Sequence, residues 1–276
     1  TMGEVIIRTK ITPEKNISNL VSRDNLLEEL KKNSDRQLIV LSGGAGYGKT
    51  SLAKQFVFSG EVNPAWYTID ETDNNLFVFL AYLTGAVSQY SEKAGESAAG
   101  ILESIRNREG APSSDTSVIN TVCGTLVNDL SKYIKDELYI ILDDLHLLPD
   151  EEGVSEVLDY LLKYLPTNVH LLITTREKLP IDTGKLKAKR KFYELSERLK
   201  FTGDEVRKLA GKEYNVELTD DDIPVIEKID GWITGVHLYL QGDRERGAEF
   251  ITKGVLPENI YSFFAEDIFS SEQDEV

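Results

Sequence analysis

The sequence is poor in cysteine: Cys123 is the only one among 276 residues. One cysteine cannot form an intrachain disulfide, and a chain without disulfides fits the reducing conditions of the cytoplasm, where we expect this protein. Cys123 lies among Ile119, Val122, Leu126 and Val127 at helical spacing. This pattern favours a buried thiol in a helix, with a reactive thiol as the alternative.

Long apolar runs and an excess of positive charge are also missing. No run approaches the roughly 18 to 20 apolar residues that a membrane-spanning helix needs, and residues 1–4 do not start a secretory signal. We therefore expect no membrane partner. The formal net charge of −16 argues against direct binding of this segment to a nucleic-acid backbone. The basic run at residues 185–191 is interpreted as a solvated loop, with a nucleic-acid patch as the alternative.

The apolar residues that are present follow two alternating patterns. Hydrophobic residues make up 41% of the sequence, enough for a substantial core. Continuous β-prone runs predict strands at residues 37–42, 65–70, 138–142, 169–174 and 191–195. Helical spacing predicts helices at 24–32, 49–58, 75–90, 115–134 and 154–165, whereas 91–114, rich in Ser, Gly, Ala and Glu, predicts a connection with some helix. Long crossovers between strands predict an α/β fold with a parallel β-sheet flanked by helices.

The pattern changes after about residue 196. Residues 201–211, 219–230 and 233–240 have the spacing of short helices, and no further strand is indicated. We therefore predict a nucleotide-binding α/β domain at 1–195 and a small all-α helical domain at 196–256. An amphipathic pattern at 258–269 predicts a further helix within 257–276.

A glycine-rich loop carries the clearest functional signal. Gly43, Gly48, Lys49 and Thr50 match the pattern G-x-x-x-x-G-K-[ST], between a predicted buried strand and a predicted helix. In such a P-loop, backbone N–H groups and the helix dipole hold phosphates, the lysine reaches the β- and γ-phosphates, and the hydroxyl ligates Mg²⁺. The alternative is a chance glycine turn. The expected nucleotide contacts are Gly43, Gly44, Ala45, Gly46, Tyr47, Gly48, Lys49, Thr50 and Ser51.

Two acidic residues follow the apolar strand predicted at 138–142. This is the Walker B pattern, in which a buried strand delivers a carboxylate to Mg²⁺. We assign Asp143 to the metal and Asp144 to the orientation or activation of the attacking water; an ordinary strand end is the alternative. The strand at 169–174 ends in hydroxyls and Arg176, which we expect to sense the γ-phosphate, with a surface arginine as the alternative.

The base is expected to be adenine. Guanine-specific Ras-like proteins carry an Asn-Lys-x-Asp tetrapeptide, and this sequence contains none. The expected cofactors are therefore ATP or ADP together with Mg²⁺.

Several motifs in a fixed order resemble the signal-transduction ATPases with numerous domains (the STAND class), and within them the MalT-like ATPases of LuxR-type transcriptional activators. The similar stretches are ITP at 11–13, LVSR at 20–23, SGGAGYGKT at 42–50, AWYTID at 65–70, LDDLHLL at 142–148, LPTNVHL at 165–171, TTRE at 174–177 and GWITG at 231–235. The resemblance implies that Val21 and Arg23 lie against the adenine. Where the family has a glycine-x-proline motif, this chain has Ile233 in place of proline.

The resemblance also implies a larger protein. Residues 257–276 would begin the linker helix toward a winged-helix domain, followed by a sensor for a small-molecule or protein inducer. DNA would be bound only through a domain absent from this chain, and ATP would promote self-association. The expected function is a slowly hydrolysing ATP-dependent switch of a signal-responsive regulator. The alternatives are a non-hydrolysing nucleotide-binding scaffold and a metabolic P-loop kinase.

Overall fold

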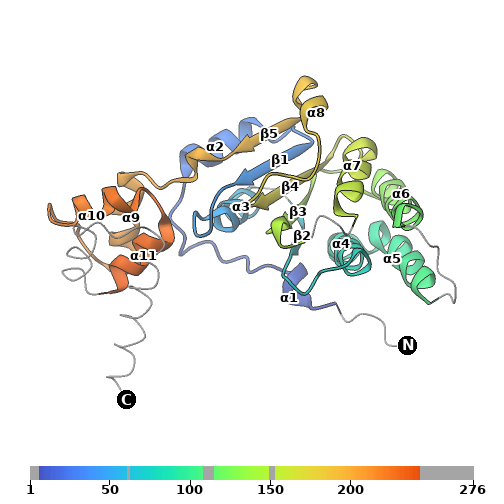
Figure 1. Ribbon diagram of the computed structural model, residues 1–276, viewed down its shortest axis with the longest axis horizontal. Helices are drawn as coiled ribbons and strands as arrows, with labels where there is room; N and C mark the ends of the chain where they lie inside the picture. Colours follow the sequence, from blue (N-terminus) through green and yellow to red (C-terminus); the bar gives the residue numbers. More distant parts are fainter. Residues whose placement is uncertain (1–5, 61–62, 108–114, 149–152, 243–276) are drawn as a thin grey trace, which may run out of the picture. The chain divides into compact units, whose positions relative to one another are not determined.

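The structure, a computed structural model, describes residues 6–60, 63–107, 115–148 and 153–242. They form two compact units, and each unit combines segments that are apart in sequence (Figure 1). The first unit comprises the described parts of 1–17, 24–42 and 50–195, and the second those of 18–23, 43–49 and 196–276. The domains predicted above are continuous in sequence, whereas the segments 18–23 and 43–49 group with the second unit. The helix predicted at 258–269 and the boundary at 256/257 lie outside the described residues.

A five-stranded parallel sheet forms the centre of the first unit. Its strands are β1 (Leu38–Ser42), β2 (Asn63–Thr68), β3 (Leu138–Asp143), β4 (Val169–Thr175) and β5 (Phe192–Leu195), in the spatial order β2-β3-β4-β1-β5. Every residue of β3 and β4 is buried. This burial explains why both strands are mainly apolar, because a parallel strand is covered on both faces. The predicted parallel α/β fold is confirmed.

Helices provide the crossovers between the strands. They are α3 (Lys49–Phe58), α4 (Leu76–Tyr90), α5 (Glu92–Arg106), α6 (Asp115–Tyr133) and α7 (Val154–Tyr164), with the short α8 (Gly184–Ala188) and η1 (Leu145–Leu147). Two further helices, the short α1 (Arg8–Ile11) and α2 (Asp24–Lys32), precede β1. Helices α4 to α7 pack against one another in chain order (Figure 1). Their inner faces complete one hydrophobic core with the sheet, and Cys123 is fully buried in it. Burial raises the pKa of the Cys123 thiol to about 12, so the thiol is inert at neutral pH.

Helix α5 extends the expectation of a connection with some helix at 91–114, because Glu92–Arg106 form one continuous helix. Its small residues serve close helix packing: a Cβ atom on Gly95 would lie 2.1 Å from Ser88 Oγ of the neighbouring helix. Ala94, Ala98 and Leu102 recur at helical spacing on its buried face. The Ala-, Gly- and Ser-rich composition is therefore typical here of a tightly packed helix. Residues 108–114 of the same stretch lie outside the described residues.

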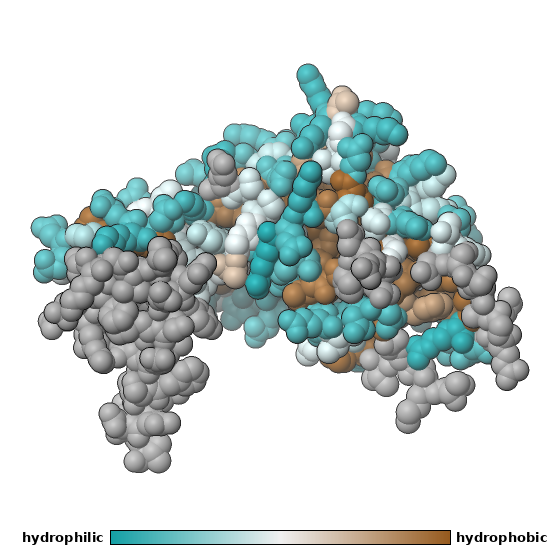
Figure 2. Space-filling view, in the orientation of Figure 1, coloured by the Kyte–Doolittle hydropathy of each residue, from teal (hydrophilic) through white to brown (hydrophobic). Residues whose placement is uncertain are grey.

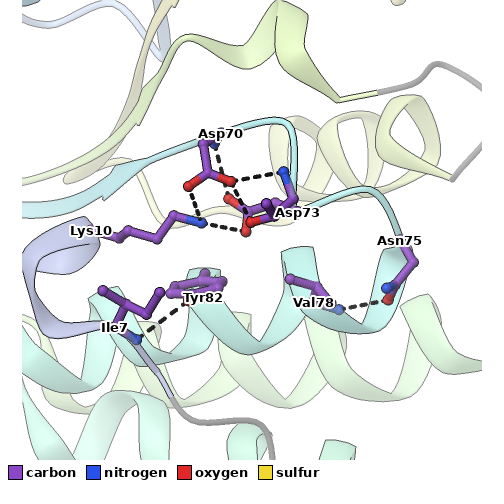
Figure 3. Close-up of polar contacts among 8 residues, drawn as sticks. Ile7, Lys10, Asp70, Asp73, Asn75, Val78 and Tyr82 are labelled. Atoms are coloured by element: carbon purple, nitrogen blue, oxygen red, sulfur yellow. Dashed lines mark hydrogen bonds and ion pairs between the residues drawn. The ribbon is translucent and has the colours of Figure 1, made fainter.

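The short helix α1 packs in the first unit through Ile11, which joins the hydrophobic core, through a hydrogen bond from the Ile7 N–H to the Tyr82 hydroxyl, and through Lys10 (Figure 3). Lys10 Nζ lies 2.5 Å from Asp73 Oδ1 and 2.9 Å from Asp70 Oδ2, and 4.5 Å from the ring centroid of Tyr82 on α4. Asp73 is almost fully buried and Asp70 is half-exposed. The ion pairs therefore fix the N-terminal segment beside the loop between β2 and α4.

The described part of the second unit contains the helices α9 (Gly203–Tyr214), α10 (Ile223–Ile229) and α11 (Ile233–Gln241), preceded by η3 (Glu197–Leu199). Helix α9 begins with a reciprocal capping box between Thr202 and Glu205. The core of this unit is built from apolar side chains of all three helices and from Val21. The segment 18–23 is thus an integral part of the second unit.

The basic run at 185–191, expected as a solvated loop, is exposed, but its first part belongs to helix α8. Residues 185, 187 and 189–191 are all exposed, and the surface over α8 is hydrophilic in Figure 2. Lys187 Nζ lies 5.0 Å from the ring centroid of Phe192.

Candidate nucleotide-binding site

The P-loop connects β1 to α3. Gly46 and Gly48 have φ angles of +72° and +75°, which glycine adopts without the steric cost that a Cβ atom brings. Lys49 is buried, and its Nζ donates hydrogen bonds to the carbonyl oxygens of Gly43 at 2.8 Å and Gly44 at 2.7 Å. The backbone of the loop therefore holds the Lys49 ammonium group in place.

A buried carboxylate ends strand β3. Asp143 is 1% exposed, and its Oδ1 accepts hydrogen bonds from Thr50 Oγ1 at 2.8 Å and from Thr174 Oγ1 at 2.7 Å. Thr50 lies in the first turn of α3, and Thr174 near the end of β4. Because β4 lies between β1 and β3, its hydroxyl stands beside the end of the Walker B strand. Hydroxyl groups from two other elements, α3 and β4, thus hold one carboxylate oxygen at the carboxyl edge of the sheet.

The environment of Asp143 disfavours its negative charge. Burial raises the pKa of the carboxyl group to about 6, and the nearby charge of Asp144 adds to the shift. The hydrogen bonds from Thr174 and Thr50 and the positive charge of Lys54 act in the opposite direction. A buried carboxylate whose charge is incompletely balanced is well suited to a cation.

Asp144 has an unusual backbone conformation. Its φ and ψ angles are 62° and 44°, the left-handed region that Asp and Asn tolerate better than other non-glycine residues. The conformation is held by its N–H group, which donates to Thr174 Oγ1 at 2.8 Å. The side chain is 29% exposed, and Oδ1 lies 3.8 Å from Nδ1 of His146. The Asp144 carboxylate, which follows the metal-ligand candidate Asp143, is thus accessible to solvent, and its backbone conformation is fixed.

Arg176 follows the end of β4 directly and is exposed. In the described part of the chain its guanidinium has no hydrogen bond or ion pair. Since β3 and β4 are neighbouring parallel strands, Asp144 and Arg176 follow adjacent strand ends. Ser51, also expected at the nucleotide, lies in α3 and is partly buried.

Val21 and Arg23 lie in the second unit. The guanidinium of Arg23 donates to the carbonyl oxygens of Leu199 at 2.7 Å and Lys200 at 2.9 Å, and its Nε lies 3.1 Å from Glu205 Oε1. It also stacks on the Phe201 ring at 4.1 Å. These contacts make Arg23 a structural bridge within its unit, and an adenine contact by Arg23 stays a prediction.

Thr174 is the residue whose importance the sequence patterns did not indicate. Its hydroxyl donates to Asp143 and accepts from the Asp144 backbone, so it fixes both acidic residues. The available signal was a buried strand that ends in consecutive hydroxyls, but only the strand order shows that this strand lies beside β3.

We predict that Thr174→Val destabilises the protein by about 1–3 kcal/mol, because the Asp144 N–H loses its acceptor and Asp143 loses a donor in a buried site. Thr174→Ser is the matched control, since it keeps the hydroxyl, and it should lie much closer to wild type. Urea denaturation of the three proteins measures the difference. Equal stabilities for the Val and Ser variants would contradict this role of the hydroxyl.

These features define a P-loop ATPase fold together with a helical unit. They are a P-loop after β1, a Walker B carboxylate at the end of β3, and the polar end of β4, which lies between these two strands. The chain belongs to the family described as Nephrocystin 3, N-terminal, whose model matches residues 17–176, more than half of the chain.

Curated relatives refine this assignment. The chain is 28% identical over 193 residues to the HTH-type transcriptional regulator MalT of Vibrio cholerae, covering 70% of this chain and 20% of that protein. It is 26% identical over 234 residues to MalT of Vibrio parahaemolyticus, covering 84% and 25%. The chain thus spans only about a fifth to a quarter of the length of these relatives. The expectation of a MalT-like ATPase of the STAND class is confirmed.

Solved structures share the fold. A STAND protein with a tetratricopeptide repeat sensor from Pyrococcus horikoshii matches with a TM-score of 0.61 and 17% identity, over 90% of this chain and 32% of that one. A Walker-type ATPase of Pyrococcus abyssi matches with a TM-score of 0.50 and 14% identity, over 98% and 79%. Among the described helices, none has the length and apolar character needed to cross a membrane.

Proposed function

We propose that this chain is the nucleotide-controlled switch module of a signal-responsive regulator, and that it binds ATP or ADP with Mg²⁺ and hydrolyses ATP slowly. The observation that supports this most is the Asp143 carboxylate, held by the hydroxyls of Thr50 and Thr174 at the carboxyl edge of the sheet. The regulatory role rests on the MalT relatives, which are named as HTH-type transcriptional regulators.

The residues present fit Mg²⁺ better than a transition metal. No group of three or more His, Cys, Asp or Glu side chains in the described ranges could hold a metal by itself. Mg²⁺ needs no such cluster, because it is usually bound by one or two protein oxygens, phosphates and water. Thr50 and Asp143 would hold the ion, whose charge would neutralise the phosphates. Burial of Asp143 favours this pairing, since a cation would remove the cost of its buried charge.

The remaining residues take roles that follow from their chemistry. The Lys49 ammonium, now bonded to two loop carbonyls, would turn to the β- and γ-phosphates. The partly exposed Asp144 would accept a proton from the attacking water or orient it. The exposed guanidinium of Arg176 would bind the γ-phosphate, which is the group that distinguishes ATP from ADP.

A switch requires that the two nucleotides favour different states of the protein. A ligand shifts such an equilibrium only by the difference between its affinities for the two states. Contacts to the γ-phosphate supply that difference, and hydrolysis removes it. We propose that a small-molecule or protein inducer and DNA bind to domains outside this chain. We also propose that the ATP-bound state promotes self-association.

The decisive test is the Asp144→Asn variant. Asparagine keeps the size of the side chain and tolerates the left-handed backbone, so it removes the charge with little structural change. We expect phosphate release to fall by about 100-fold or more, since positioned acid–base groups typically contribute 10²–10⁴-fold, while ATP affinity by calorimetry stays within about threefold of wild type. Single-turnover hydrolysis of radiolabelled ATP measures a slow rate directly.

Two controls separate this proposal from its alternatives. Asp204→Asn removes a well-exposed carboxylate of the second unit and should leave hydrolysis unchanged. If wild type binds ATP but neither wild type nor Asp144→Asn releases phosphate, the chain is a non-hydrolysing scaffold. A burst of ADP that depends on a small-molecule acceptor would instead indicate a kinase.

A further inference from the structure

The P-loop and helix α11 share hydrogen bonds within the second unit. Trp232 Nε1 donates to the Ala45 carbonyl at 2.9 Å. The backbone N–H and the hydroxyl of Thr234 donate to the Gly46 carbonyl at 3.2 and 3.3 Å. Together with the two bonds from Lys49, they give each of the carbonyls of residues 43–46 a donor.

These bonds serve the helix as well as the loop. Trp232 is the N-cap residue of α11, and its side chain makes no capping bond. The first N–H groups of a helix have no partner within the helix and need acceptors from elsewhere. The Gly46 carbonyl fills this need for Thr234, so the P-loop caps α11.

Close packing leaves little freedom at this contact. A Cβ atom on Gly46 would lie 2.2 Å from Thr234 Oγ1 and 2.7 Å from Trp232 Nε1. The indole is fixed from its other side by Gly235, where a Cβ atom would lie 2.3 Å from the ring. The contact is therefore close because Gly46 on the loop and Gly235 on α11 both lack a Cβ atom. This allows Trp232 and Thr234 to reach the carbonyl groups of Ala45 and Gly46.

Peptide planarity connects this contact to phosphate binding. In a trans peptide the C=O and N–H bonds point in opposite directions. A donor on the Ala45 carbonyl thus sets the direction of the Gly46 N–H, and a donor on the Gly46 carbonyl sets that of the Tyr47 N–H. P-loops hold phosphates with such N–H groups. Trp232 and Thr234 therefore orient two of the expected phosphate donors through the carbonyls of the preceding peptide groups.

We propose that Trp232 and Thr234 are positioning residues that couple phosphate occupancy of the P-loop to the first turn of helix α11. The inference rests on the proposed function, because it assumes that the loop binds a nucleotide. Phosphate binding strengthens the preference of the Gly46 and Tyr47 N–H groups for one direction, and this steadies the carbonyls that cap α11. Such coupling is reciprocal: loosening the contact weakens nucleotide binding, and nucleotide tightens the contact.

Tryptophan fluorescence reports this contact. The chain has two tryptophans, and Trp66 is buried in β2 of the first unit, where its Nε1 donates to Thr68 Oγ1 at 2.7 Å. In a Trp66→Phe protein, the emission comes from Trp232 alone. We expect the emission maximum or intensity to change on addition of Mg²⁺–ADP, with the same half-saturation that calorimetry gives for binding.

Substitutions at the contact test the direction of the effect. Trp232→Phe keeps the ring and removes the N–H donor, and Thr234→Val removes the hydroxyl. Each should lower the affinity for Mg²⁺–ADP by about 3- to 10-fold, the range expected for one hydrogen bond. Thr234→Ser keeps the hydroxyl and should restore near wild-type affinity. Thermal denaturation without nucleotide identifies any variant that has lost its fold. If Trp232→Phe does not fold, the comparison of Thr234→Val with Thr234→Ser still tests the proposal.

The outcomes distinguish the two proposals. If calorimetry shows that nucleotide binds, but Trp232 emission is unchanged and Thr234→Val and Trp232→Phe bind as wild type does, the coupling is refuted while the switch function stands. If wild type binds no nucleotide by calorimetry, both fail together. A response of Trp232 with weakened binding in both variants and rescue by serine supports the coupling.

Discussion

Asp143→Asn is expected to abolish the Mg²⁺-dependent part of ATP binding and hydrolysis while making the nucleotide-free protein more stable. Asparagine can still accept the hydrogen bonds from Thr50 and Thr174, so the local structure is kept. It removes the charge that a cation requires and that burial penalises. Function and stability should therefore change in opposite directions at one position, as expected for a site built to hold a charge.

The size of the stability gain follows from the pKa of Asp143. The pKa is raised from 3.8 to about 6 in the folded protein, chiefly by burial. The folded state thus keeps its proton over a pH range in which the unfolded chain has lost it, and wild-type stability falls as pH rises from about 4 to about 6. The asparagine variant lacks this fall. At pH 7 it should be more stable by roughly 3 kcal/mol at most.

Urea denaturation without nucleotide, at pH 4.5 and pH 7, measures this prediction. Asp204→Asn removes an equal charge from an exposed position and should leave the pH profile unchanged. Equal pH dependence in wild type and Asp143→Asn would show that this carboxyl group titrates normally. Calorimetry with and without Mg²⁺ then measures the loss of metal-dependent ATP affinity, which should be at least tenfold.

Lys10→Met should destabilise the first unit by about 3–5 kcal/mol, because it leaves the nearly fully buried Asp73 without its ammonium partner. Methionine keeps most of the aliphatic length, so the loss reports the charge. Burial opposes the charge of Lys10, but the hydrogen bonds to Asp73 and Asp70 outweigh it, and the Lys10 pKa is raised from 10.5. The ammonium's contribution is therefore complete below pH 10.5 and is lost as pH rises through its folded pKa.

A double-mutant cycle with Asp73→Asn isolates the pair. The double variant has no unpaired buried charge at this position, so it should be more stable than Lys10→Met alone. In the wild type, the hydrogen bond from Thr72 and the pairing with Lys10 lower the Asp70 pKa, and Lys10→Met removes the second of these effects while leaving the half-exposed Asp70 in contact with water. A loss of less than about 1 kcal/mol in Lys10→Met would mean that water solvates Asp73.

Sequence patterns predicted the sheet well because its strands are buried on both faces. Strands such as β3 and β4 are therefore mainly apolar, and that signal is local. For helix α5 the sequence predicted only a connection with some helix, because its small residues resemble a linker until α4 is placed against them. Gly95 shows the difference: it serves a close approach to Ser88 that only the packed structure reveals.

The site was predictable only as far as its motifs are continuous in sequence. Lys49, Thr50 and Asp143 follow from local patterns with a known chemistry. The role of Thr174 depends on the strand order, which places β4 between β1 and β3. The contact of Trp232 with Ala45 joins residues 187 positions apart, and no local pattern indicates it.

The membership of residues 43–49 in the second unit limits how this ATPase can be dismantled or rebuilt. A fragment cut after Leu195 would retain the whole glycine signature and every strand, yet it would lose the donors to Ala45 and Gly46. A chimaera that takes its helices from a relative would need to inherit residues 231–235 together with the loop. The smallest part of the nucleotide-binding loop that can be transferred to another protein therefore consists of two distant segments, 43–49 and 231–235. They have to be exchanged as a pair.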